Sequence, residues 1–562
     1  MDDPLRCAER HRGRSLQIRR SPFWLLLLLA SLAPAAGAAP QALAVVSVAG
    51  QSDIAGGLDA LGAAIETTGL AASVGAELAR LTRIASLDGL DPDRRWGAAL
   101  MVDGPLLAPL AIVPVRDIDA LLASLAPLLG DVERQANGTM KIGRGEWTGY
   151  LAVRDGWAFL AQTREDLRVL PDAKALLAPP REGVDAALAF YPRRLPEAYR
   201  TMALDYLRAE LRAREADDAG RDAHGEEWAT AALRAVERSL ADAEAVLWSW
   251  TLDAAGGTVS LDLEVVAVAD SELAASIARF EKRSVALPGV GDEAVAFALG
   301  SGWSQPATAP IAAEEIELPE RALFEVLALL PPGEVLPPGE VREKRTTRDA
   351  LADEFRAAID EARRQGAVRW SAEMVGRELP WTLALEFDLG DAAKAHAFSE
   401  RLKAAIGATP AKGGPGDASG WSAELSSADG QAARSVFGEE DKLHAAAVGG
   451  RVLLAIGPQA EERLRKRAES TDAPSDEQAA LRGWFRLGTL LRATARWDAD
   501  GGNGGLINTM AEQARLGDDR VFVTAAGRER RLMVHVELRD GTLRLAASQI
   551  ATAAFLLKLV PR

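Results

Sequence analysis

The chain has almost no cysteine. Its 562 residues contain one, Cys7, which lies in a leader that we predict to be removed. The remainder can therefore form no disulfide, no cysteine-ligated metal site and no cysteine-linked lipid anchor. Its stability must come from burial, and a hydrophobic content of 48% over roughly 520 residues is enough for a large core.

Basic residues are fewer than acidic residues. The chain carries 65 Lys and Arg against 81 Asp and Glu, a formal net charge of −16. Because the leader holds six Arg and three acids, a net +3, the rest of the chain is near −19. A surface this acidic repels nucleic acid and anionic lipid, and no basic run is interleaved with aromatic residues. We predict no nucleic-acid partner.

The first 38 residues have the pattern of a secretory signal peptide. Six arginines precede a short apolar run, Phe23–Leu32, and Ala36-Gly37-Ala38 fits a cleavage site before Ala39. The run is shorter than the ~20 residues that a membrane span needs. We therefore predict cleavage of residues 1–38, with a retained anchor as the alternative, and no stable membrane span in the rest. The Arg-rich and Ala-rich composition is typical of a high-GC bacterial genome, so we predict an extracytoplasmic location: periplasm, cell surface or medium.

One pattern occurs four times: a strand, a short turn, a second strand, an Asp and a helix. The four acids are Asp117, Asp270, Asp391 and Asp540. Before them apolar residues alternate with polar ones, and after them apolar residues recur at helical spacing. Each Asp stands where a helix needs an acceptor for its free N–H groups. We predict four N-caps rather than four catalytic acids.

A longer repeat surrounds these hairpins. A leading strand such as Ala187–Tyr191, a helical region, the hairpin, its helix and a further strand give the order β-α-β-β-α-β of a ferredoxin-like unit. We predict an α+β protein, internally duplicated, with antiparallel sheets and helices packed on one face. The predicted halves are 39–290, with modules at about 39–180 and 181–290, and 291–562, with modules at about 291–475 and 476–562.

Asp155-Gly156, in the segment GYLAVRDGWAFLAQTREDL, is either a hairpin turn or an acid held at a site. A segment of the same shape, AAAVGGRVLLAIGPQAEERL, follows in the second half of the chain with Gly449-Gly450 in its place. Asp-Gly and Gly-Gly are interchangeable in a tight hairpin because both tolerate positive φ. We predict a turn at both positions.

Three further segments raise the question of a ligand site, and each has a simpler interpretation. Gly289–Ala294 matches a loose dinucleotide fingerprint, but a helix precedes it and a strand follows, the reverse of what phosphate binding requires. Trp497–Gly505 resembles a calcium loop, yet Asn503 and Thr509 stand where a glycine and an acid are needed. The acidic loop at 217–227 could hold a divalent ion, although a solvated cap on a helical hairpin is favoured.

Histidine is rare. His11, His224, His396, His444 and His535 stand apart in the sequence, and the motifs HExxH, Walker A and GxSxG are absent. We assign no catalytic, cofactor-binding or metal-binding residue and predict no cofactor. A hydrolase with a dispersed site stays an alternative. It requires His396, His444 or His535 to lie within hydrogen-bond reach of both a carboxylate and a Ser or Thr in a cleft.

Tryptophan is over-used relative to tyrosine, thirteen against four. Trp96, Trp250 and Trp370 each fall in the first strand of a hairpin, and we predict that they are core anchors. Exposed tryptophans would instead stack on a sugar or grip an apolar ligand. Both possibilities stay open for Trp147, Trp157, Trp303 and Trp421.

The leading strands, the capped hairpins and the segment YLAVRDGWAFLAQTREDL resemble exported bacterial proteins classed as domains of unknown function. The resemblance implies an extracytoplasmic α+β protein without assigned chemistry. We favour a non-catalytic envelope protein that binds a partner protein through its modules. The other alternative, besides the hydrolase, is a carrier that holds a small apolar ligand between a curved sheet and its helices. A large cavity lined by Leu, Val and Trp would support the carrier.

Overall fold

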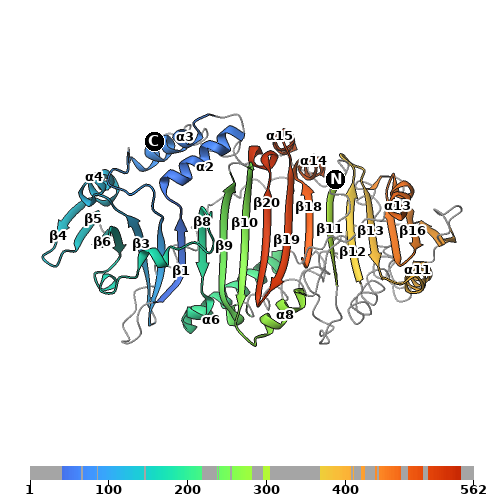
Figure 1. Cartoon of the computed structure of the whole chain (residues 1–562), viewed down its shortest axis with the longest axis horizontal. Coiled ribbons are helices and arrows are strands. Elements are labelled where there is room, and N and C mark those ends of the chain that lie inside the picture. The colour runs from blue at the N-terminus through green and yellow to red at the C-terminus, as the bar shows by residue number, and fades with distance from the viewer. Residues whose placement is uncertain are drawn as a thin grey trace, which may run out of the picture.

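A computed structural model of the chain describes residues 41–64, 68–84, 86–104, 106–144, 147–217, 237, 240–253, 256–281, 295–303, 368–406, 409–410, 419–424, 437–438, 442–469, 479–497 and 504–545. The strands of these segments belong to one sheet of 20 strands (Figure 1). Twenty strands spaced at about 4.8 Å extend over roughly 90 Å along the hydrogen-bonding direction. The helices pack against the faces of this sheet.

Ten strands come from the first half of the chain. The elements are β1 (Gln41–Val48), α2 (Gln51–Ala64), α3 (Leu70–Thr82), β2 (Trp96–Asp103), β3 (Leu106–Pro114), α4 (Ile118–Leu129), β4 (Asp131–Arg134), β5 (Met140–Arg144), β6 (Trp147–Arg154), β7 (Trp157–Ala161), η3 (Glu165–Leu167), α5 (Ala173–Leu176), β8 (Ala186–Phe190), η4 (Pro192–Arg194), α6 (Glu197–Asp217), β9 (Ala243–Asp253), β10 (Thr258–Ala267) and α8 (Glu272–Phe280).

The other ten strands come from the second half. The elements are β11 (Val295–Trp303), β12 (Val368–Val375), β13 (Thr382–Asp388), α11 (Ala392–Ile406), β14 (Thr409–Pro410), β15 (Ser419–Glu424), β16 (Lys442–Val448), β17 (Arg451–Ile456), α13 (Ala460–Glu469), β18 (Leu481–Arg486), α14 (Leu487–Trp497), α15 (Gly504–Ala514), β19 (Arg520–Arg528) and β20 (Arg531–Leu538).

The pairing of these strands gives a linear order, and every pair is antiparallel. From edge to edge it runs β4, β5, β6, β7, β3, β2, β1, β8, β9, β10, β20, β19, β18, β11, β12, β13, β17, β16, β15, β14. Read inward from either edge, the order is the same once β11 to β20 are counted as β1 to β10. The two sets meet where β10 pairs with β20, from Val259↔Leu538 to Val266↔Arg531.

Both edges of the sheet are short. At one edge β4 has four residues, three of them charged, and at the other β14 has two residues and includes Pro410. Charged side chains and proline at an edge discourage pairing with a further strand. The composition of β4 and β14 therefore disfavours the addition of a further strand at either edge.

The predicted ferredoxin-like units are wrong. The prediction was of separate antiparallel sheets with helices on one face, whereas the strands form one continuous sheet. A single helix between two strands would carry the chain back for a parallel neighbour. Between β1 and β2 the chain instead forms two helices, α2 and α3, which return it to the end it left, so the next strand is an antiparallel neighbour.

The predicted division into halves at 290 and 291, and into four modules, stays a prediction. The strands of 39–290 and 291–562 do not make separate sheets, because the β10–β20 pairing joins them. The segment 282–294, which contains the predicted boundary, lies outside the described residues.

Register divides the central side chains between two faces, because residues directly opposite one another share a face and successive residues alternate. One row over β1, β8, β9, β10 and β20 consists of Val46, Leu188, Trp248, Leu263 and Val534. The adjacent row, on the opposite face, consists of Ser47, Ala187, Ser249, Asp262 and His535. We call these the apolar face and the polar face.

Helices cover both faces toward the flanks. On the apolar face, Leu121 and Leu122 of α4 and Phe398 and Leu402 of α11 enter the core. On the polar face the cover comes from α5, whose Ala173 packs in the same cluster as Ile112 and Phe159, and from α13. The helices are therefore not confined to one face, which is a second departure from the predicted arrangement.

The predicted hairpin turns are confirmed. Asp155 and Gly156 have φ of 54° and 73° and connect Arg154 to Trp157, its partner on β7. Gly449, with φ of 57°, lies in the equivalent two-residue turn between β16 and β17. Positive φ at Asp155 and Gly449, the first position of each turn, explains why Asp and Gly both occur there. Asp155 is a turn residue.

Two of the four predicted N-caps are confirmed and two are wrong. Asp117 accepts from the backbone N–H groups of Asp119 and Ala120 at α4, and Asp391 accepts from that of Lys394 at α11. At α8 the cap is Ser271, and Asp270 has a left-handed backbone. The carboxylate of Asp540 accepts instead from the backbone N–H of Asp518.

A buried ion pair fixes α13 to the polar face. The carboxylate of Glu373 on β12 accepts from Nε and Nη2 of Arg463, at 2.6 and 2.7 Å. The Glu373 side chain is 1% exposed, and Arg463 and Arg467 are each 11% exposed. Arg467 lies 3.4 Å from the same carboxylate and 3.2 Å from Glu386. Each buried charge of this cluster therefore has a partner of opposite charge, without which its burial would be strongly destabilising.

We expect Glu373→Gln to lower the free energy of unfolding by about 3–5 kcal/mol, because it leaves the nearly buried guanidinium of Arg463 without its carboxylate and leaves Arg467 with Glu386 alone. Chemical denaturation measures the change. Glu462→Gln is the matched control, since Glu462 pairs on the same helix with Lys466 in the open and its loss should change stability little. Equal effects of the two substitutions would contradict a structural role for Glu373.

Candidate functional site

The segments that the sequence singled out as ligand loops are mostly not described. Gly289–Ala294 and residues 498–503 of the Trp497–Gly505 loop lie outside the described residues, and of the acidic loop 217–227 only Asp217, the end of α6, lies inside. In the part of the chain that is described, no group of three or more His, Cys, Asp or Glu is placed to hold a metal ion. No helix there is both long and apolar enough to cross a membrane.

Two of the three predicted tryptophan anchors are wrong. Trp370 is 3% exposed and packs in the core. Trp96 is 39% exposed and Trp250 is 49% exposed. Four other tryptophans were predicted to be either core residues or exposed ligand contacts. Of these, Trp157 and Trp421 are buried and Trp147 is exposed. The side chain of Trp303 lies outside the described part of the structure. Two aromatic side chains expected inside the protein therefore lie at its surface.

The exposed tryptophans belong to a continuous patch on the apolar face. Trp96 lies opposite Val48 on β1, which lies opposite Ala186 on β8. Ala186 lies opposite Trp250, and Trp250 lies opposite Leu261 on β10. The large exposed side chains of the patch are Val46, Trp96, Trp248, Trp250 and Leu261, with exposed fractions from 39% to 49%. We call these five residues the open apolar surface.

Helices border this surface but leave it uncovered. A Cβ on Gly57 of α2 would lie 2.9 Å from Cδ2 of Leu252, two residues beyond Trp250 on β9. Toward the other end of the strands, α8 packs on the same face, where a Cβ on Gly527 would meet the carbonyl oxygen of Ile277 at 2.6 Å. In Figure 1 α2 and α8 lie at opposite ends of the central strands. Contiguous exposed apolar side chains of this size mark interaction sites in soluble proteins.

The polar face carries an ion-paired histidine at the seam of the two strand sets. Nδ1 of His535 on β20 lies 2.8 Å from Oδ1 of Asp262 on β10, and Arg181 pairs with the second oxygen of that carboxylate. The hydrogen bond to Asp262 raises the pKa of His535 above its ordinary value of 6.5, against the opposing effect of burial. Burial by itself would raise the pKa of Asp262, but hydrogen bonds from His535 and Arg181 outweigh it, so the pKa falls below 3.8.

These contacts do not assemble the hydrolase site that the sequence left open. Thr524 lies directly opposite His535 on β19, yet within the described chain no hydrogen bond joins them. The backbone N–H groups of β19 and β20 that form the pairing between these strands are not free to bind an oxyanion.

The other two described histidines lie on β16 and α11. His444 lies opposite Ser422 on β15 and 3.5 Å from Glu461, whose side chain is 83% exposed. In a catalytic triad the carboxylate is buried and holds the imidazole in one orientation. The Glu461 carboxylate is largely exposed to solvent. His396 is exposed on α11. The hydrolase hypothesis stays an alternative.

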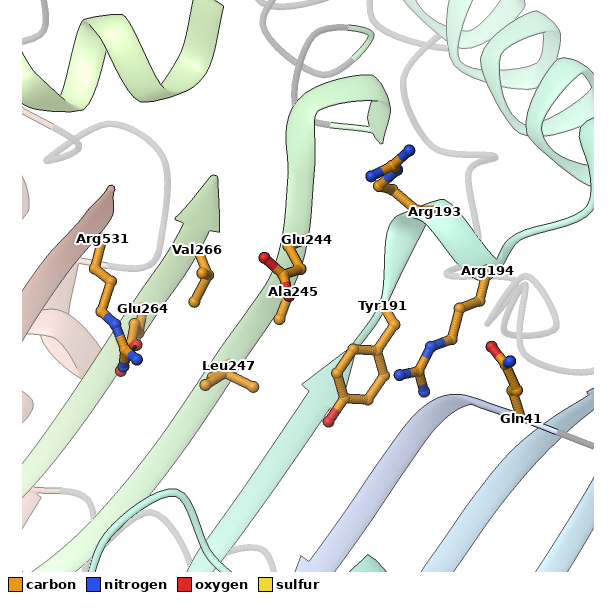
Figure 2. A pocket seen from close by; sticks show the side chains of 10 residues that line it. All are labelled: Gln41, Tyr191, Arg193, Arg194, Glu244, Ala245, Leu247, Glu264, Val266 and Arg531. Atoms are coloured by element: carbon orange, nitrogen blue, oxygen red, sulfur yellow. Dashed lines mark hydrogen bonds and ion pairs between the residues drawn. The ribbon is translucent and has the colours of Figure 1, made fainter. Parts of the chain in front are cut away.

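The polar face also holds a pocket of about 540 Å³, which is lined by Glu264 and Arg531 of the same strands that carry Asp262 and His535 (Figure 2). Its lining residues are Gln41, Tyr191, Arg193, Arg194, Glu244, Ala245, Leu247, Glu264, Val266 and Arg531. Five of the ten are charged. This lining differs from the Leu, Val and Trp lining that would support the carrier hypothesis.

Comparison of the chain with protein-family models, with curated proteins and with solved structures gave no match. The resemblance to exported bacterial domains of unknown function therefore stays a prediction, and the site is interpreted from its own geometry.

We expect Asp262→Asn to lower the pKa of His535, because it removes the negative charge that stabilises the imidazolium. The stabilising contribution of the raised His535 pKa is complete below about pH 6.5 and is lost as the pH rises through the folded-state pKa. The contribution of the depressed Asp262 pKa is present above about pH 3.8 and is lost as the pH falls through its folded-state value. The pair should therefore stabilise the wild type most between these limits.

A pH titration of the imidazole resonances by NMR, with His535 assigned from a His535→Gln variant, measures the pKa. Asp103→Asn is the control, because Asp103 is an exposed carboxylate at the end of β2, several strands away from β20. A His535 pKa that stays the same in Asp262→Asn would show that the contact is not populated in solution.

Proposed function

We propose that the chain is an exported, non-catalytic binding protein that docks a partner protein on the open apolar surface. Export rests on the predicted signal peptide at 1–38. The observation that supports the binding role is the set of large apolar side chains on β2, β1, β9 and β10, each 39% exposed or more. Three of them, Trp96, Trp248 and Trp250, are of the residue type that most often anchors a protein interface.

The shape of the surface favours a protein over a small apolar ligand. From β2 to β10 the surface spans four strand spacings, roughly 19 Å. A small-molecule site buries most of its ligand in an enclosed pocket, whereas these side chains face outward from an open sheet. A partner that presents a complementary apolar surface would cover all five at once, and the acidic remainder of the chain would keep the unbound protein in solution.

The test is a photo-crosslinking amino acid at position 250 in the full chain, expressed in its own host, followed by mass spectrometry of the crosslinked product. We expect one protein partner. With that partner purified, Trp250→Lys should weaken binding about 30-fold, the effect of losing a central aromatic anchor. Trp147→Lys is the matched control, since Trp147 is 44% exposed on β6, outside the open apolar surface, and should leave affinity unchanged.

Two outcomes would contradict this function. Equal loss of affinity in Trp250→Lys and Trp147→Lys would place the interface elsewhere. A lipid retained in a native mass spectrum of the protein purified from its own host, with no protein crosslinked at position 250, would favour the carrier alternative.

A further inference from the structure

The pocket on the polar face is independent of the open apolar surface. Leu247 lines the pocket and Trp248 belongs to the apolar surface, and successive residues of β9 point to opposite faces of the sheet. A ligand in the pocket and a partner on the apolar surface therefore do not compete for the same side chains. An experiment that contradicts ligand binding in the pocket therefore does not contradict partner binding on the open apolar surface, and the reverse also holds.

One wall of the pocket carries two guanidiniums that pair with no carboxylate of the described residues. Arg193 and Arg194 follow β8 in η4, and the part of the chain that is described pairs neither with an acid. The Arg194 guanidinium lies 4.0 Å from the centre of the Tyr191 ring and donates through Nη1 to the carbonyl oxygen of Ala42 at 2.5 Å. Stacking and this hydrogen bond hold Arg194 in place, while its remaining N–H donors are available to an anion.

The opposite wall is different, because its arginine, Arg531, is already paired with a carboxylate. Arg531 donates to Glu264 at 2.6 Å. Glu244 is 61% exposed, and its contact with Arg530 is long, at 3.9 Å. Figure 2 shows Arg193 and Arg194 on one side of the pocket and Glu264 with Arg531 on the other. The surplus of positive charge therefore lies at Arg193 and Arg194.

The floor between the two walls is apolar. Ala245 and Leu247 of β9 and Val266 of β10 lie between the arginines and the Glu264–Arg531 pair. A ligand that fits must place a negative charge on Arg193 and Arg194 and an uncharged body on this floor. The carboxylates of Glu244 and Glu264 repel a second negative charge on the same ligand.

We propose that the pocket binds a small organic monocarboxylate with a short apolar body. Its carboxylate accepts hydrogen bonds from Arg193 and Arg194, the geometry for which a guanidinium is suited. Its hydrocarbon part covers Leu247 and Val266. A volume of about 540 Å³ is within the range of small-molecule sites. On a chain this acidic, an uncompensated pair of arginines is the feature that selects an anion.

The test is a ligand-observed NMR titration of the full exported chain with hexanoate at low salt. We expect saturable binding with a Kd of about 1 mM, the scale for a ligand of this size. Arg193→Gln should weaken it about tenfold through the loss of a charge-assisted hydrogen bond. Arg164→Gln, at an exposed arginine outside the pocket, should have no effect. Arg193 is the better site to vary, because Arg194 also holds the backbone at Ala42.

A second variant decides the chemical class of the ligand. Glu244→Gln removes a repulsive charge, so hexanoate should bind more tightly, by a few-fold. Tighter binding of leucine than of hexanoate, lost in Glu244→Gln, would assign the pocket to zwitterions and overturn the proposal. Inorganic phosphate that competes as well as hexanoate would make it a general anion site and would also overturn it. So would the absence of saturable binding, or equal affinity in Arg193→Gln.

Discussion

The hydrogen-bonded pairing of β10 with β20 is the constraint on which the rest of the structure depends. It joins strands that are hundreds of residues apart in the sequence, from Val259↔Leu538 to Val266↔Arg531, and so converts two sets of ten strands into one sheet. Every antiparallel pair fixes which side chains share a face. A slip of one residue at this seam would turn His535 toward the apolar face and break its contact with Asp262. The seam therefore sets the chemistry of both faces.

Those two faces explain the two binding roles proposed here. The apolar face is covered by helices toward the flanks and left open over β1, β8, β9 and β10, where Trp248 and Trp250 are exposed. The polar face carries ion pairs such as Arg531–Glu264 and the pocket beside Arg193 and Arg194. An apolar surface that binds a macromolecule and a charged pocket that binds a small anion can coexist because a strand directs alternate side chains to opposite sides.

Local features could be predicted from the sequence and long-range ones could not. The Asp155-Gly156 turn and the Asp117 cap depend on a few neighbouring residues, and the structure has both. The cap at α8 was missed because Ser271, next to Asp270, is an equally good acceptor. The alternation of Trp248 and Trp250 with Ser249 shows which side chains share a face, but not whether anything covers that face. Likewise, no local signal connects His535 to Asp262, which lies 273 residues earlier.

The most direct test of the continuous sheet is a disulfide across its seam. Leu263 and Val534 lie directly opposite one another, at a separation that suits a disulfide, and the only native cysteine, Cys7, is in the predicted leader. Oxidation of the full chain carrying Leu263→Cys and Val534→Cys should form a bond within one molecule. Leu263→Cys with Leu538→Cys, about 13 Å further along β20, should form none. A bond in the second pair, or no bond in the first, would contradict the joined sheet.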